Sequence, residues 1–301
     1  MSKILHLHSI TEINSFMDHK VRHPLVEVID FSQREERFEG GTSITCDFYI
    51  VMFKNYCGNK LRYGRKPHDF QDGSLLCVAP KQLLTLDNER EDRQDMMGWG
   101  LFFHPDLIRG TSLGAKMKDY SFFSYETNEA LHLSDKEKHI LYEIVQKIDA
   151  ELTENIDKHS QTLITSNIEL LLNYCTRYYD RQFITRKTTN QDILTRIELA
   201  LTNYFQSADI REKGLPNVKY LAEQVHLSPN YLSDLLKRET GMNAKDRIHY
   251  YLIEEAKNLL LSTNKTIGEL AFDLGFEYPQ YFSRLFKSKT GMTPIEYRSL
   301  N

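Results

Sequence analysis

Two stretches near the end of the chain decide its fold: LAEQVHLSPNYLSDLLKRETGM at residues 221–242 and LAFDLGFEYPQYFSRLFKSKTGM at residues 270–292. Both read Leu-Ala, a short gap, Pro-x-Tyr-x-Ser-x-Leu-x-Lys and then Thr-Gly-Met, and the second carries one extra residue near Glu277. A pattern repeated at this length indicates a repeated structural unit. The apolar spacing predicts a short helix, a tight turn and a second helix in each copy.

The first copy contains start signals for both of its helices. Asn217 precedes the first apolar stripe, and Ser228 followed by Pro229 precedes the second. Serine can accept a hydrogen bond from a free helix amide, and proline lacks the amide that would have no partner there. His226 occupies the turn position that Gly275 has in the second copy. The first turn must therefore either hold a left-handed histidine or adopt another geometry.

The second copy begins with a capping box formed by Thr266 and Glu269, and Thr293 with Glu296 marks a further short helix after it. Its second helix is expected to bury Tyr281, Phe282, Leu285 and Phe286. Between the copies, residues 244–262 predict one amphipathic helix longer than about 25 Å. A helix, a tight turn and a second helix form an arrangement that can place the second, recognition helix in the major groove of DNA. Such a spacer would let the two recognition helices address successive major-groove faces of one duplex, which lie roughly 34 Å apart.

Polar side chains share one face of the second helix in each copy, opposite the apolar stripe. They are Asn230, Ser233, Asp234 and Lys237 in the first copy, and Gln280, Ser283, Arg284 and Lys287 in the second. Arg284 can pair with guanine through two hydrogen bonds, and Gln280 or Asn230 can do so with adenine. Asp234 must either accept from cytosine or hold a neighbouring cation, because phosphate repels it. A solvated helix face is the alternative reading, and the parallel placement in two copies argues against it.

This arrangement resembles the DNA-binding domain of the AraC/XylS family of transcription regulators over about residues 191–301, most densely from Ile267 to Tyr297. The resemblance implies base contacts at Pro229, Asn230, Ser233, Asp234, Pro279, Gln280, Ser283 and Arg284, and phosphate contacts at Lys237, Lys287 and Lys289. It also implies double-stranded promoter DNA and RNA polymerase as partners, and it favours activation over repression.

Composition sets limits on this reading. The chain has 301 residues and a net charge of −4, with room for two or three domains. Residues 217–301 carry 11 Lys and Arg against 10 Asp and Glu, so motif geometry rather than a basic tail supports DNA binding.

No apolar run approaches the length of a membrane span, and the start lacks an apolar signal segment. With no C-x-x-C spacing among Cys46, Cys57, Cys77 and Cys175, we expect a cytoplasmic protein with reduced thiols.

Residues 1–130 have a β-rich texture, with short apolar runs at 25–31, 48–53 and 75–79 separated by turn signals. In this context they resemble the cupin-like sensor barrel that precedes such DNA-binding domains, which implies a small-molecule effector. Aromatic residues that could line a ligand cavity are Tyr49, Phe53, Trp99 and Phe102, together with Tyr63 and Phe103. Plain core packing is the alternative for all of them.

Residues 131–184 predict a helical hairpin that opens with a capping box at Ser134 and Glu137. The resemblance favours homodimerisation through this hairpin, and packing within one chain is the alternative. We expect a polar linker at 185–192 and the DNA-binding domain at 193–301. The predicted fold class is therefore α+β, with an N-terminal antiparallel barrel, a helical hairpin and an all-α domain with two helix-turn-helix motifs.

No metal or cofactor is expected, because His6-x-His8 lacks a third ligand near it in the sequence, and His68 lacks a neighbouring histidine. His19, His23 and His104 also lie in this half. The alternative function is an enzyme, either a cupin-type catalyst or an alkyl-transfer repair protein fused to a DNA-binding module. Because no convergent reactive set is visible, the sequence favours a regulator without enzymatic activity.

Overall fold

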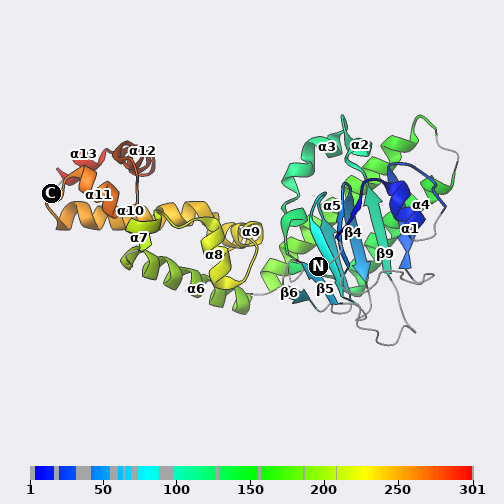
Figure 1. Cartoon of the computed structure of the whole chain (residues 1–301), viewed down its shortest axis with the longest axis horizontal. Helices are drawn as coiled ribbons and strands as arrows, with labels where there is room; N and C mark the ends of the chain where they lie inside the picture. Colours follow the sequence, from blue (N-terminus) through cyan, green and yellow to red (C-terminus); the bar gives the residue numbers. More distant parts are fainter. Residues whose placement is uncertain are drawn as a thin grey trace. The chain divides into compact units, whose positions relative to one another are not determined.

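The computed structural model describes residues 4–16, 20–31, 42–54, 60–63, 66–68, 73–87, 98–126, 129–154, 157–185, 187–207 and 209–299. The chain divides into two compact units, Met1–Thr185 and Arg186–Asn301. The first unit combines strands and helices, and the second is helical where it is described (Figure 1). The fold is therefore α+β, as predicted. No helix in the described ranges is long and apolar enough to cross a membrane.

The described strands of the first unit pair into two five-stranded sheets, with the orders β1-β3-β8-β5-β6 and β10-β7-β4-β9-β2. The first sheet comprises β1 Ile4–Leu7, β3 Thr42–Cys46, β8 Leu83–Asp87, β5 Lys60–Tyr63 and β6 Lys66–His68. The second comprises β10 Leu131–His132, β7 Ser74–Val78, β4 Tyr49–Lys54, β9 Gly98–Phe103 and β2 Val26–Asp30. β1 and β3 are parallel and the other pairs are antiparallel. The three apolar runs of the sequence correspond to β2, β4 and β7.

One apolar core lies between these two sheets. Ile44 of β3 and Leu84 of β8 pack there with Met52 of β4 and Phe102 of β9, and all four side chains are buried. The helix α1, Ile10–Phe16, closes this core with Ile10 and Ile13. Among the described strands, the edges of the two sheets are not paired with one another, so a closed barrel is not seen. The cupin-like barrel stays a prediction.

Helices cover the other face of the second sheet. They are α2 Pro105–Ile108, α3 Ser112–Lys116, the 3₁₀ turns η2 Met117–Asp119 and η3 Ser121–Ser124, α4 Asp135–Thr153 and α5 Ser160–Thr185. The predicted capping box is confirmed, because the Ser134 amide donates to Glu137 Oε2 at 2.8 Å. Tyr179 of α5 stacks on Phe122 with ring centroids 5.4 Å apart. The α4–α5 hairpin therefore packs within its own unit, and its role in dimerisation stays a prediction.

The second unit consists of α6 Lys187–Gln206, α7 Asp209–Lys213, α8 Val218–Val225, α9 Pro229–Thr240, α10 Ala244–Ser262, α11 Ile267–Asp273, α12 Pro279–Thr290 and α13 Pro294–Arg298. The helix α10 runs past the helices of both motifs (Figure 1), and two apolar cores lie along it. Ala244 and Ile248 of α10 join the core around α8 and α9. Leu252 and Leu260 of the same helix join the core around α11 and α12. The connector between the repeats is thus one helix with the predicted bounds.

The predicted polar linker at 185–192 is largely helical. α6 begins at Lys187, six residues before the expected start of the leading helix. One cause lies in tertiary contact: the buried Asn190 side chain donates to Glu239 Oε1 of α9 at 2.8 Å, which fixes the first turns of α6. The division between the two units falls just before this helix, between Thr185 and Arg186.

Candidate DNA-binding interface

Local capping bonds set the first helix-turn-helix. Asn217 Oδ1 accepts from the Tyr220 amide at 2.8 Å and starts α8. Ser228 Oγ accepts from the Tyr231 amide at 3.2 Å and starts α9. His226 ends α8 in the left-handed region with φ 60°, so the first of the two turn geometries allowed by the sequence is the one adopted.

The second motif repeats this construction. The Thr266 amide donates to Glu269 Oε2 at 2.7 Å, and the Glu269 amide donates to Thr266 Oγ1 at 3.2 Å, which confirms the predicted capping box. Gly275 has φ 80°, and a Cβ there would lie only 2.6 Å from the carbonyl oxygen of Ile210. Only glycine therefore fits this turn without displacing α7. The α7 helix was not predicted from the sequence.

The apolar stripes of α9 and α12 differ at two equivalent positions: Tyr281 is exposed where Tyr231 is buried, and Leu285 is only partly buried where Leu235 is fully buried. In α9 the predicted residues Tyr231, Leu232, Leu235 and Leu236 are all buried. In α12 Phe282 and Phe286 are buried, but Tyr281 is 55% exposed and the expectation that it would be buried is wrong. Its ring meets Tyr278 edge-on at 5.8 Å, within the stretch that carries the extra residue of the second copy. Phe282 and Phe286 close this core without it.

The predicted base-contacting residues lie where α9 and α12 begin, on surfaces that protein does not cover. Those that are exposed are Pro229, Asn230, Gln280 and Arg284, and those that are partly exposed are Ser233, Asp234, Pro279 and Ser283. Among the described residues, the Arg284 side chain has no hydrogen-bond or ion-pair partner. The geometry thus leaves both helix faces accessible, and their contacts with bases stay a prediction.

Three lysines follow the predicted base-contacting residues. Lys237 and Lys287 are exposed in the last turns of α9 and α12. Lys289 is half-exposed and forms an ion pair with Asp246 Oδ1 of α10 at 3.0 Å. This hydrogen bond is the main reason that the pKa of Asp246 lies below its ordinary value. A phosphate contact by Lys289 would therefore have to compete with Asp246.

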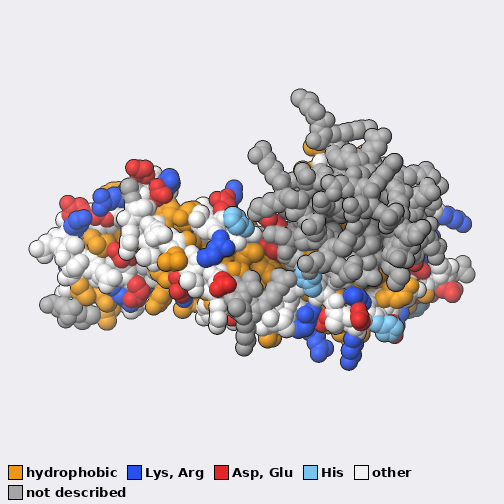
Figure 2. Space-filling view, turned by 90° about the horizontal axis from the view of Figure 1, so that it is seen from below, with side chains coloured by type: hydrophobic (Ala, Val, Ile, Leu, Met, Phe, Trp, Pro, Cys, Tyr) orange, Lys and Arg blue, Asp and Glu red, His pale blue; other side chains and the backbone are white. Residues whose placement is uncertain are grey.

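Acidic and basic side chains are interspersed over the second unit, the left half of Figure 2, on the face shown there. Further ion pairs join Arg247 to Glu198, and both Arg211 and Lys265 to Asp273. A large field of one sign, which would attract any nucleic acid, is absent from this face. The sequence has the same balance over residues 217–301, with 11 Lys and Arg against 10 Asp and Glu, and recognition through the two helix faces stays a prediction.

The aromatic ligand candidates of the first unit lie on two faces of the second sheet. β4 and β9 pair Tyr49 with Phe103, Phe53 with Trp99, and Ile50 with Phe102. Side chains alternate between the faces of a sheet, so Phe102 points opposite to Tyr49, Phe53 and Trp99. Phe102 fills the core between the sheets, whereas Tyr49 packs on Phe123 of η3 with ring centroids 5.0 Å apart. Core packing, the alternative reading, fits these contacts. The Tyr63 side chain lies outside the described residues.

Histidines of the first unit differ in their surroundings. His104 Nδ1 accepts from the Asp106 amide at 3.2 Å, and His23 Nδ1 accepts from the Leu25 amide at 3.1 Å, so both have local structural bonds. His19 and the His68 side chain lie outside the described residues. His6 and His8, which the sequence leaves without a third ligand, lie beside Asp47. The strand pairing that brings Asp47 there spans about forty positions, which sequence spacing does not show.

Comparisons with known proteins agree with this geometry. Residues 221–299 match the helix-turn-helix domain family. The chain is 30% identical over 164 residues to the HTH-type transcriptional regulator YfiF of Bacillus subtilis, covering 54% of this chain and 48% of that protein. It is 35% identical over 83 residues to the arabinose operon regulatory protein of Salmonella typhimurium, covering 28% and 30%. The matches thus span less than half of these relatives.

Among solved structures, the C-terminal domain of AraT, a response regulator from Geobacillus stearothermophilus, is 31% identical, with a TM-score of 0.32, and the match covers 36% of this chain and 85% of that one. The two motifs, their caps and the sequence matches define a DNA-binding domain of the helix-turn-helix class. More particularly, the second unit carries the AraC-type form of that domain.

Proposed function

We propose that this chain is a sequence-specific transcription regulator that binds double-stranded promoter DNA through both helix-turn-helix motifs. One observation carries the proposal: α9 and α12 each present polar side chains on an open face, and both pack on the single helix α10. At about 1.5 Å per residue, the 19 residues of α10 extend about 28 Å, close to one turn of duplex DNA. Two groove contacts on one duplex then reinforce each other.

Within this proposal Arg284, Gln280 and Asn230 are the strongest candidates for reading bases, because their side chains can each make two hydrogen bonds to a purine edge. Pro229, Ser233, Asp234, Pro279 and Ser283 complete the base-contacting set, and Lys237, Lys287 and Lys289 hold phosphates. Exposure of both helix faces supports these assignments.

The regulator would act as an activator through RNA polymerase, respond to a small molecule or partner through its first unit, and work in the cytoplasm. The names of two relatives support transcriptional regulation and activation: the arabinose operon regulatory protein, and the bifunctional transcriptional activator and DNA repair enzyme AdaA of Bacillus subtilis. The match to AdaA covers 27% of this chain. We propose no enzymatic activity, because the matched relatives are predominantly described as transcriptional regulators.

The α4–α5 hairpin would supply a homodimer contact. Leu163 and Leu170 lie seven positions apart on α5 and are 49% and 42% exposed. Tyr142 of α4 is 42% exposed. Residues at this spacing share a helix face, and an apolar face in water favours a protein partner. Sedimentation of the full chain over a range of concentrations tests this part of the proposal.

Selection from a pool of random duplexes tests DNA recognition. The wild-type chain should enrich one motif, and the double variant Asn230→Ala with Arg284→Ala should lose the enrichment while its circular dichroism stays unchanged. Arg211→Ala is the matched control, since it removes an exposed arginine from α7, which Figure 1 shows on the opposite side of α10 from α12. A folded wild-type chain that enriches no motif would contradict the proposal.

A further inference from the structure

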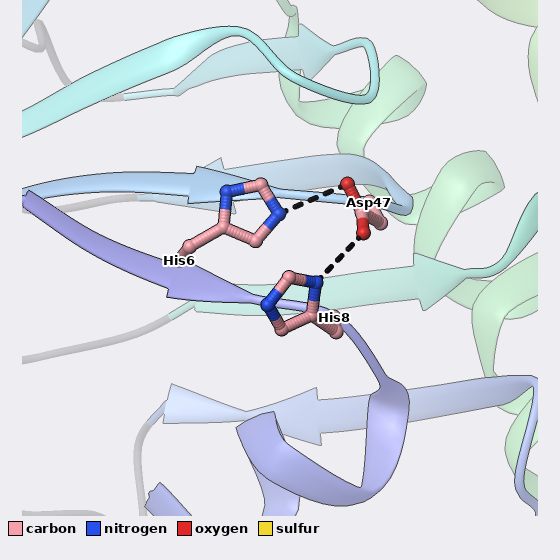
Figure 3. Close-up of side chains that lie close together, drawn as sticks. All are labelled: His6, His8 and Asp47. Atoms are coloured by element: carbon pink, nitrogen blue, oxygen red, sulfur yellow. Dashed lines mark hydrogen bonds and ion pairs between the residues drawn. The ribbon is translucent and has the colours of Figure 1, made fainter.

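Two histidines and an aspartate of the first unit converge on the outer face of the first sheet. His6 Nε2 lies 3.0 Å from Asp47 Oδ1, and His8 Nδ1 lies 3.0 Å from Asp47 Oδ2 (Figure 3). The two imidazole rings are side by side, with centroids 4.2 Å apart. A ring nitrogen of each histidine thus lies within hydrogen-bond distance of one oxygen of the same carboxylate.

The register of two parallel strands produces this convergence. β1 pairs with β3 so that Leu5 is opposite Ile44, His6 opposite Thr45 and Leu7 opposite Cys46. The Asp47 amide donates to the Leu7 carbonyl at 3.0 Å, so the register continues past the strand ends. Because side chains alternate, the apolar residues of both strands point into the core, and His6, His8, Thr45 and Asp47 share the outer face.

We propose that His6, His8 and Asp47 bind one divalent transition-metal ion of the Zn²⁺ class. Two imidazole nitrogens and one carboxylate oxygen are ligands that zinc and its neighbours accept, whereas Ca²⁺ and Mg²⁺ prefer sets made of oxygen atoms. The candidate ligand atoms all lie within 4.8 Å of one another. Tetrahedral coordination at zinc–ligand distances near 2.1 Å places ligand atoms about 3.4 Å apart, so small side-chain rotations suffice. Water would complete the coordination.

Hydrogen atoms can rearrange to accommodate the ion. With Asp47 ionised, each nitrogen that faces it carries a hydrogen, and a bound metal needs the lone pair of that nitrogen instead. For neutral His6 the hydrogen moves from Nε2 to Nδ1, which then donates to the Thr45 hydroxyl at 2.5 Å. The same hydroxyl donates to Nδ1 in the metal-free state. Such a bond behind the ligand is the usual support for a metal-binding histidine.

A second support holds the backbone of His8. Its amide donates to Glu12 Oε2 at 2.8 Å, which fixes the end of β1 against the start of α1. β1 is the edge strand of its sheet, and β3 is its only partner among the described strands. The ion would therefore bind this edge strand to the turn that follows β3. The proposal is independent of DNA binding.

Zinc binding by the tag-free full-length protein, measured in competition with a chromogenic chelator, tests the site. We expect one Zn²⁺ bound per chain, and Asp47→Asn or His8→Ala should weaken it at least tenfold. Thr45→Val should weaken it by about tenfold, the lower end of the usual effect of such supporting bonds. His139→Gln is the matched control, because His139 faces Glu143 on α4 at 3.3 Å and offers an isolated pair. Its affinity should equal that of the wild type.

Absorption spectra of Co²⁺ bound in place of zinc test the identity of the ligands. Cysteine ligands give a thiolate charge-transfer band, whereas histidine nitrogen and aspartate oxygen ligands do not. Hydrogen exchange gives an independent readout: Zn²⁺ should slow exchange of the β1 amides in the wild type and leave it unchanged in Asp47→Asn. Unchanged thermal unfolding of the metal-free variants shows that their loss of zinc is local, as expected for His8, which is 65% exposed. Equal zinc affinity of wild type and Asp47→Asn, or a thiolate band, would overturn the proposal.

Discussion

Tyr231 and Tyr281 occupy equivalent positions in the two repeats, yet Tyr231 is 3% exposed and Tyr281 is 55% exposed. Tyr231 lies in the buried stripe of α9, whereas Tyr281 leans on Tyr278 at the surface of α12. The two repeats thus have the same order of helices and turns, but α9 buries its tyrosine in the apolar core whereas α12 leaves the equivalent tyrosine exposed.

Alanine substitutions should separate these two tyrosines. Tyr231→Ala removes a buried ring and leaves a cavity, so it should lower the free energy of unfolding by about 3 kcal/mol. Tyr281→Ala removes an exposed ring and should change it by less than about 1 kcal/mol. Urea denaturation followed by circular dichroism measures both. Equal losses for the two variants would show that the second repeat buries its tyrosine after all.

The two turns predict a second asymmetry. Gly275→Ala should lower the free energy of unfolding by more than about 2 kcal/mol for two reasons. Alanine is strained in the left-handed backbone conformation of this position, and its Cβ would lie 2.6 Å from the Ile210 carbonyl oxygen. His226→Gly relieves a left-handed side chain at φ 60° and adds freedom to the unfolded chain. These effects oppose each other, so the net change should stay within about 1 kcal/mol. Thermal unfolding of both variants beside the wild type checks the difference, and a large loss in His226→Gly would contradict it.

Local signals in the sequence predict much of this unit. Caps such as Asn217, Ser228 and Thr266 act within three residues of their partners, so the sequence shows them directly. The early start of α6 depends on a bond between Asn190 and a residue 49 positions away. Tyr281 is exposed although its spacing to Phe282 and Phe286 equals that of Tyr231 to Leu232 and Leu236, so the periodicity does not show this difference.

The first unit was less predictable for the same reason. Apolar runs located β2, β4 and β7, but strand pairing determines which face each side chain occupies. Phe102 therefore separates from Tyr49 only when β4 and β9 are in register. Likewise, Asp47 joins His6 only through the parallel pairing of β1 with β3.

Two substitutions in α12 should differ in their effect on DNA binding. Arg284→Ala should weaken binding to the selected site by about 1–3 kcal/mol and relax one base position, because it removes a base-reading side chain. Lys287→Ala should weaken binding to all duplexes and reduce the slope of affinity against salt by about one ion, as expected for one lost phosphate contact. Gel-shift titrations at several salt concentrations measure both, with Arg211→Ala as the control. A loss in Lys287→Ala confined to one sequence would contradict its assignment to phosphate.

The ion pair between Lys289 and Asp246 predicts a pH dependence of stability. The hydrogen bond from Lys289 holds the pKa of Asp246 below its ordinary value of 3.8, so the folded state favours the carboxylate. A group with a lowered folded pKa stabilises the fold above its unfolded pKa, and this contribution is lost as the pH falls through the folded value.

Lys289→Met should therefore move the pKa of Asp246 upward, because it removes the hydrogen bond that is the largest cause of the lowering. It should reduce stability at neutral pH only slightly, because the pair is partly solvated. That deficit should vanish at a pH well below 3.8, where Asp246 is protonated in both proteins. Carboxyl NMR titration gives the pKa, and urea denaturation at the two pH values gives the stability. Lys287→Met is the control, because it removes a neighbouring charge from the same helix and should leave the Asp246 titration unchanged. A stability deficit of Lys289→Met that persists in acid would show that lost packing, and not the lost ion pair, causes the deficit.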